Sequence, residues 1–161
     1  MERLWAPWRM EYIEKCDEPC ACIFCELPKK GNDRENLILF RGEHSFVIMN
    51  KFPYAVGHLM VAPYRHTADL NDLPAEELTD IFLNTRECVN ILKKAMKPQG
   101  FNVGANLGRS GGAGIVDHVH FHIVPRWNGD SNFMPVIGGT KVVSQSLEKT
   151  YDRLYPMFLE K

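Results

Sequence analysis

Residues 117–126 constrain this chain more than any other stretch, since they read Asp-His-Val-His-Phe-His-Ile-Val-Pro-Arg. His118, His120 and His122 stand at every second position, and the residues between them are β-branched or aromatic, which favours a strand. Alternate side chains of a strand share a face, so the three imidazoles would line one side, with neighbours about 6–7 Å apart. The intervening residues would face a core: Val119, Phe121 and Ile123. Each imidazole carries a polar nitrogen that needs a partner, so this row indicates a functional site.

Such a row suits two kinds of chemistry. Imidazoles on one face of a strand can converge on a metal ion. An imidazole can also act as a covalent nucleophile or as an acid and base, because it titrates near neutral pH. The row alone does not decide between them.

The rest of the chain predicts an α+β fold, an antiparallel β-sheet with one long helix and a C-terminal helix. Short apolar runs predict strands at 37–40, 45–50, 58–63 and 101–107, in addition to 118–124. Pro74 and the acids after it open the long helix, which ends before Pro98. Its apolar stripe is expected to be core: Leu78, Ile81, Phe82, Cys88, Val89, Leu92 and Met96. Residues 145–160 predict the C-terminal helix.

We expect an N-terminal segment, 1–35, and one globular domain, 36–161. With 161 residues, a net charge of -1 and 45% hydrophobic residues, the chain is typical of a soluble globular protein. That charge gives no basic field for nucleic acid, and no apolar run is long enough to span a membrane. The first residues lack the apolar stretch of a signal peptide. We therefore expect a cytoplasmic protein with reduced cysteines.

Cys22 and Cys25 form a Cys-x-x-Cys pair, a spacing that lets two thiolates hold one zinc ion from a tight turn. Two further ligands, most simply histidines, would have to come from elsewhere. The alternatives are a redox pair or buried thiols. Cys16 and Cys20 receive no role.

A glycine-rich loop, 108–114, joins the strand at 101–107 to the histidine strand. Glycines allow a close approach of the backbone to a ligand, and their N–H groups bind phosphate well. Arg109 and Ser110 add a charge and a hydroxyl. Next to three aligned imidazoles, this loop suggests phosphoryl or nucleotidyl transfer.

The segment 118–124 fits the motif of the histidine triad family, His-φ-His-φ-His-φ-φ, at every position. Residues 46–63 resemble the nucleoside-binding hairpin of that family. Residues 4–10, 100–104 and 125–130 resemble the branch with diadenosine tetraphosphate phosphorylases and hydrolases. The resemblance implies an antiparallel sheet with helices packed on it, a homodimer, and a nucleotide or dinucleoside polyphosphate as substrate, with no organic cofactor.

The resemblance also implies residue roles. His120 would attack the α-phosphorus and form a nucleotidyl-imidazole, while His118 and His122 would hold phosphate oxygens, orient the ring or manage protons. Asn50 would meet the ribose and His58 would support the triad from beneath. The remaining nucleotide-binding positions are an apolar wall around the base and a set that stabilises charge: Phe46, Ile48 and Leu59, then Asn106, Arg109, Ser110, Gly111 and Gly112.

Some members of that family bind a structural zinc ion at positions that match Cys22, Cys25, His66 and His118 here. One departure concerns Gly114, where many members carry Gln, Ser or Thr near the leaving group. The acceptor of the nucleotide, water or phosphate, stays open, with Arg109, Arg126 and Lys141 as possible anion-binding residues. Two other functions also stay open: a metal-dependent hydrolase that uses the triad as ligands, and a non-catalytic nucleotide-binding module.

Overall fold

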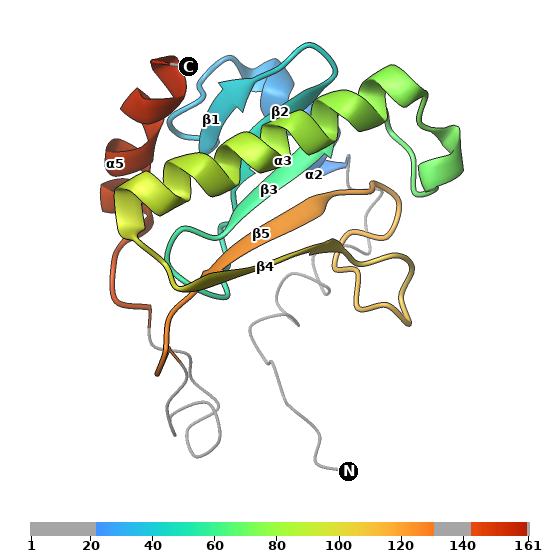
Figure 1. Ribbon diagram of the computed structural model, residues 1–161. Coiled ribbons are helices and arrows are strands. Elements are labelled where there is room, and N and C mark those ends of the chain that lie inside the picture. Colours follow the sequence, from blue (N-terminus) through green and yellow to red (C-terminus); the bar gives the residue numbers. More distant parts are fainter. Residues whose placement is uncertain (1–21, 131–142, 161) are drawn as a thin grey trace.

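The computed structural model describes residues 22–130 and 143–160. Its centre is a five-stranded sheet in the order β1-β2-β3-β5-β4, in which each neighbouring pair is antiparallel (Figure 1). The strands are β1 Ile38–Arg41, β2 Ser45–Met49, β3 Leu59–Pro63, β4 Gly100–Ala105 and β5 Phe121–Arg126. This arrangement, with the helices below, confirms the predicted α+β class.

The long helix α3, Ala75–Met96, crosses one face of the sheet, and α5, Leu147–Leu159, lies beside it near β1 (Figure 1). The short helix α2, Ile23–Glu26, packs on the opposite face. Two 3-10 turns complete the described elements, η2 Leu27–Lys30 and η3 Leu70–Asp72. Among these residues, no helix has the length and apolar character needed to cross a bilayer.

Strand alternation divides the apolar residues between two cores. Val47 and Met49 of β2 point to the core under α3 and α5, whereas Phe46 and Ile48 point to the core under α2. The smaller core also holds Ile38, Met60 and Ala62. The smaller core therefore lies on the face of the sheet that α3 leaves uncovered.

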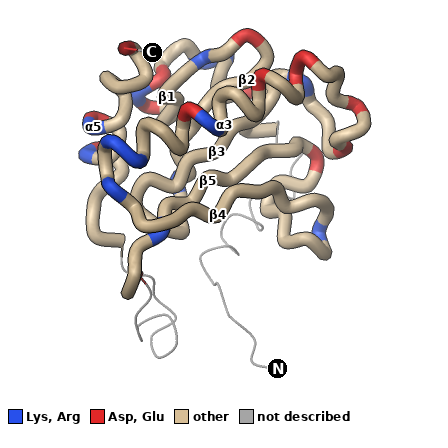
Figure 2. The backbone as a smooth tube through the Cα atoms, viewed as in Figure 1, with Lys and Arg blue, Asp and Glu red and all other residues tan. Residues whose placement is uncertain are grey.

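The ends of α3 follow the helix dipole. Acidic Glu76 and Glu77 lie in its first turn and basic Lys93 and Lys94 in its last, and Figure 2 shows the two signs gathered at opposite ends. Lys97 ends the helix in the left-handed conformation. The charges at both ends support the predicted helix boundaries.

Two details differ from the sequence prediction. The histidine strand starts only at Phe121, because the backbone N–H of Val119 donates to the Thr67 oxygen in the loop after β3 rather than to a ladder partner. Phe82 is not core but 55% exposed, and its ring contacts Phe121 on β5, the strand next to β4.

Some sequence-based expectations fall on residues that the structure does not describe. Outside the described ranges lie residues 4–10, Cys16, Cys20 and Lys141.

Candidate functional site

The three histidines of the motif lie on the sheet face opposite α3. His118 and His120 are buried there, and both contact the ring of Phe24. The rings of His120 and His122 meet edge to face, with centroids 4.8 Å apart. The residues between them lie in the core under α3: Val119, Phe121 and Ile123. The alternation predicted from the motif is thus confirmed.

The ring of His120 is held in one tautomer. Its Nδ1 lies 2.9 Å from the backbone oxygen of His118, and because a carbonyl oxygen only accepts, Nδ1 carries the proton. In the neutral ring Nε2 then keeps its lone pair, and Nε2 forms no hydrogen bond with the described residues. Burial lowers the pKa of His120, which favours the neutral form. The arrangement leaves Nε2 as a nucleophilic nitrogen.

His122 is oriented by a chain of two hydrogen bonds. The backbone N–H of Tyr54 donates to Nδ1 of His58 at 3.1 Å, so a neutral His58 carries its proton on Nε2. That Nε2–H donates to Nδ1 of His122 at 2.9 Å. A neutral His122 therefore carries its own proton on Nε2, where it can act as a donor. The Tyr54 ring covers both imidazoles, with centroids 4.7 Å from His58 and 5.9 Å from His122.

Cys22, Cys25, His66 and His118 bring four ligand atoms within 4.8 Å of one another. The Nδ1 atom of His118 lies 3.2 and 3.6 Å from the two sulfurs and 3.4 Å from Nδ1 of His66, which is 3.4 Å from Sγ of Cys25. Ordinary zinc bond lengths give tetrahedral edges of about 3.3 Å between nitrogens and about 3.6 Å between nitrogen and sulfur. The four side chains thus fit a closed tetrahedral zinc site.

The chemistry of the donors agrees with the geometry. Nε2–H of His118 donates to the Pro63 oxygen at 2.9 Å, which leaves the Nδ1 lone pair facing the cluster. Burial lowers the pKa of His118 and so favours the neutral, ligating ring. Burial and the adjacent Cys22 raise the pKa of Cys25, so its thiolate needs a cation nearby.

The expected apolar wall is only partly on this face. Phe46 and Ile48 are buried in the core under α2, next to Phe24. Leu59 lies in the other core, under α3, because it pairs with Met49 in the β2–β3 ladder and shares its face. Met60, which pairs with Ile48, takes the place expected for Leu59.

The glycine loop closes on itself. The amides of Gly112 and Ala113 donate to the oxygens of Arg109 and Gly108, and the side chain of Asn106 donates to the Gly112 oxygen. These two amides therefore serve the loop rather than a ligand. The other predicted residues of the loop lie exposed beside the histidine segment: Arg109, Ser110 and Gly111.

The remaining predicted residues divide by position. Asn50 follows β2. Its side-chain Oδ1 accepts a hydrogen bond from the backbone N–H of Phe52, and its backbone N–H donates to the backbone oxygen of His58. Arg126 ends β5, the end remote from His120, and its guanidinium pairs with Asp130 and Asn102. The geometry therefore does not support Arg126 as an anion-binding residue of this site.

Sequence reasoning missed Phe24 and Tyr54 as residues of the site. Phe24 stands between the two cysteines and packs on His120 with ring centroids 4.7 Å apart. A large apolar residue inside a metal-binding turn was the available signal. Tyr54 acts partly through its backbone N–H, which no side-chain pattern reveals.

Comparison with known proteins agrees with this geometry. The family model described as "HIT domain" matches residues 32–129, more than half of the chain. The chain is 40% identical over 158 residues to an AP-4-A phosphorylase of Mycobacterium tuberculosis, which covers 93% of this chain and 80% of that protein. It is 30% identical over 133 residues to a bis(5'-adenosyl)-triphosphatase of Dictyostelium discoideum, which covers 79% of this chain and 89% of that protein.

The fold also matches solved structures. A zinc-bound histidine triad family protein from Mycobacterium smegmatis superposes with a TM-score of 0.69 at 23% identity, covering 87% of this chain and 94% of that one. This likeness supports the sheet order and helix placement described above.

Proposed function

Because this chain belongs to the HIT domain family, we propose that it cleaves dinucleoside polyphosphates through a nucleotidyl intermediate on His120. The observation that carries this proposal is the fixed tautomer of the buried ring, with Nδ1–H on the His118 oxygen and the lone pair on Nε2. The names of its relatives, a phosphorylase and a triphosphatase, support the substrate class.

In the first step Nε2 of His120 attacks the α-phosphorus, a P–N bond forms, and the P–O bond to the leaving polyphosphate breaks. The substituted imidazole becomes cationic. The His118 carbonyl oxygen, which already accepts from Nδ1–H, stabilises that charge. Nε2–H of His122, oriented by His58, can donate a hydrogen bond to the leaving oxygen, which departs as a phosphate anion and takes no proton from the ring.

In the second step an acceptor oxygen attacks the same phosphorus, the P–N bond breaks, and the electron pair returns to Nε2. We propose inorganic phosphate as the acceptor, since the AP-4-A phosphorylase matches 93% of this chain. The adenylyl group would then leave as ADP. Water would give AMP instead, and the proton that it loses would pass to the solvent.

We also propose that Cys22, Cys25, His66 and His118 hold a structural zinc ion. With all four positions filled by protein ligands, such an ion supplies no open coordination site and acts by tying α2 to the loop after β3 and to the histidine segment. The metal-dependent hydrolase with all three histidines as ligands gains no support. Nε2 of His118 donates to the Pro63 oxygen and its Nδ1 faces the two cysteine sulfurs, so His118 offers no nitrogen to a metal ion bound by the other two imidazoles.

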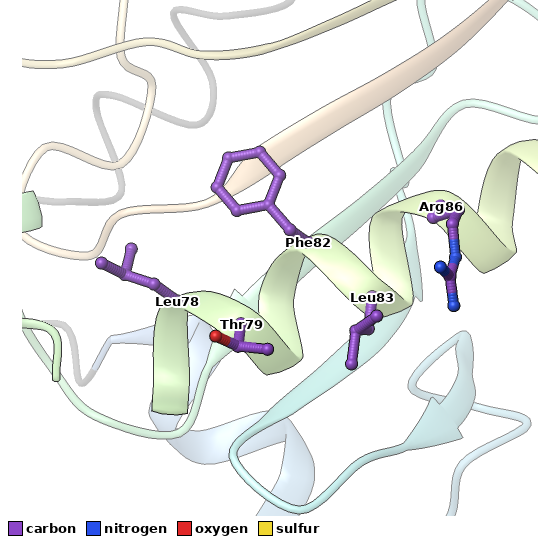
Figure 3. A pocket seen from close by; sticks show the side chains of 5 residues that line it. All are labelled: Leu78, Thr79, Phe82, Leu83 and Arg86. Atoms are coloured by element: carbon purple, nitrogen blue, oxygen red, sulfur yellow. The ribbon is translucent and has the colours of Figure 1, made fainter. Parts of the chain in front are cut away.

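A homodimer through β4 completes the proposal. Within the described sheet β4 is the last strand, and Val103 is 47% exposed on the α3 face, which it shares with its partner Ile123. The nearby surface of α3 carries an open pocket, shown in Figure 3, between exposed Phe82 and Leu83. An edge that no described strand pairs with, beside exposed apolar side chains, suits a second copy of the chain.

The test is product analysis with diadenosine tetraphosphate, with and without inorganic phosphate. ADP plus ATP formed only with phosphate supports the phosphorylase, and AMP plus ATP without phosphate supports a hydrolase instead. We expect His120→Ala and His120→Asn to bind nucleotide and to lose at least a thousandfold in turnover, on the order found for covalent nucleophiles. Nucleotide binding with no product from the wild type would favour a binding module.

A further inference from the structure

We propose that Phe24 is a positioning residue for His120, and that the turn bearing Cys22 and Cys25 sets its place. The inference rests on the proposed nucleotidyl chemistry and zinc site, and adds a link between them. Zinc occupancy would then govern the alignment of the nucleophile as well as the stability of the fold.

The contacts of Phe24 carry the first step. Its side chain is 1% exposed, and its ring lies 4.7 Å from the His120 ring and 5.3 Å from the His118 ring, measured between centroids. Beyond the imidazoles it packs against Phe46, with centroids 6.4 Å apart. Phe24 therefore fills the space between the small core and the nucleophile.

The position of Phe24 depends on Cys22 and Cys25, the two cysteines that flank it in the turn. Helix α2 has only four residues, closed by hydrogen bonds from the amides of Cys25 and Glu26 to the Cys22 oxygen. A helix this short has little stability of its own. Cys22 and Cys25 flank Phe24 and are the two sulfur positions of the metal cluster. A metal ion that joins them to His66 and His118 would fix the turn, and with it the Phe24 ring.

The His120 ring needs this support. Among the described residues, the ring has one hydrogen bond, from Nδ1 to the His118 oxygen, which fixes one point of the ring but leaves it free to pivot about that point. The Phe24 ring on one side and the His122 ring at 4.8 Å limit the pivot. An error of about 1 Å in the position of a reacting atom can cost on the order of a hundredfold in rate. Contact with Phe24 therefore helps to fix the direction in which Nε2 of His120 points.

The first experiment compares Phe24→Leu with Phe158→Leu in the full chain. Phe158 is a matched control, because it is 2% exposed and stacks on an aromatic ring, that of Phe40, but lies in the core on the other face. We expect Phe24→Leu to lower kcat at least about tenfold with KM little changed, and Phe158→Leu to keep kcat. A raised KM with unchanged kcat, or equal kcat losses in both variants, would overturn the proposal.

A second readout needs no substrate. Nitrogen-15 spectra of labelled histidines report which ring nitrogen of His120 carries the proton. We expect a single Nδ1–H form in the wild type and in Phe158→Leu, and mixed or broadened signals in Phe24→Leu. An unchanged His120 signal in Phe24→Leu would overturn the positioning role even if the wild type cleaves none of the nucleotides tested.

A third experiment varies the zinc content and separates this inference from the zinc proposal. Zinc is counted per chain, removed with a chelator and restored, and kcat and the His120 signal are followed in wild type and Phe24→Leu. We expect removal to lower kcat strongly in the wild type and only slightly in the variant, since both changes act through one contact. Equal losses in both would overturn the link to zinc. A wild type without zinc would refute the zinc site and the link, while the variant comparison would still decide the role of Phe24.

Discussion

Nε2 of His58 lies 2.9 Å from Nδ1 of His122, and the Tyr54 amide on the far side of His58 fixes the direction of that hydrogen bond. The backbone N–H of Tyr54 thus fixes, through the buried His58 ring, the nitrogen on which a neutral His122 carries its proton. His58 itself is 1% exposed, which shields the bond from water. This relationship makes His58 the residue on which hydrogen-bond donation by Nε2–H of His122 depends.

We predict that His58→Leu, which has no side-chain donor, lowers kcat for diadenosine tetraphosphate by about a hundredfold, the usual scale for loss of one hydrogen-bond donor to a developing charge. The control is His44→Leu, since the His44 ring lies beside Glu43 in the turn before β2. Adding His122→Ala to His58→Leu should cost little more, because both remove the same donor. Additive losses would refute a relay through His58.

The zinc site predicts one metal ion per chain. We expect Cys22→Ser and Cys25→Ser to reduce the zinc content from about one ion per chain toward zero, and the melting temperature to fall, because metal that binds only the folded state stabilises it. Cys88→Ala is the control, since Cys88 lies in the core under α3. Elemental analysis with thermal melts measures both. Full zinc retention in the two serine variants would refute the site.

The sequence predicted this site unevenly, for physical reasons. Strict alternation placed the imidazoles on one face, and local helix signals placed α3 nearly to its ends. Leu59, expected in the apolar wall around the base, lies in the core under α3, and its face depends on the register with Met49, a contact between strands. Phe82 carries the helical period of a core residue, yet α3 lies so that this position remains exposed near the sheet edge. The contact of Phe24 with His120 joins segments far apart in the chain and has no local signal.

Gly111 should be essential to the loop beside the triad. A Cβ atom there would lie 2.3 Å from the Leu107 oxygen, a distance that backbone atoms cannot accommodate. We predict that Gly111→Ala displaces the loop and lowers kcat/KM at least about tenfold, with little change in the free energy of unfolding because the loop is exposed. Gly100→Ala is the control, since a Cβ there meets no atom within 4 Å. Equal activity of the two variants would contradict this role.

The proposed dimer depends on the exposed edge at β4. We predict that Val103→Lys, which places a charge on that edge, converts a dimer into monomers in light scattering coupled to size exclusion. Leu159→Lys is the control, because Leu159 is 67% exposed at the end of α5, away from β4. A wild type that is monomeric at all concentrations, or a Val103→Lys variant that stays dimeric, would refute this interface.

Acid stability should depend on the ion pair between Arg65 and Glu77. The guanidinium donates to both carboxylate oxygens at 2.7 to 3.0 Å, and Arg65 holds the pKa of Glu77 below its usual range. A group with a lowered folded pKa contributes stability above its unfolded pKa, about 4.3 for Glu, and loses it as the pH falls through the folded pKa.

We therefore expect Glu77→Gln to lower the free energy of unfolding by about 1 kcal/mol at pH 7, and the difference from wild type to shrink below about pH 4 as the carboxylate is protonated. Glu76→Gln is the control, because Glu76 is exposed in the same helical turn. Urea melts at pH 7 and pH 3 measure the difference between the two variants and the wild type. A gap that stays constant from pH 7 to pH 3 would show that Glu77 acts by packing rather than by charge.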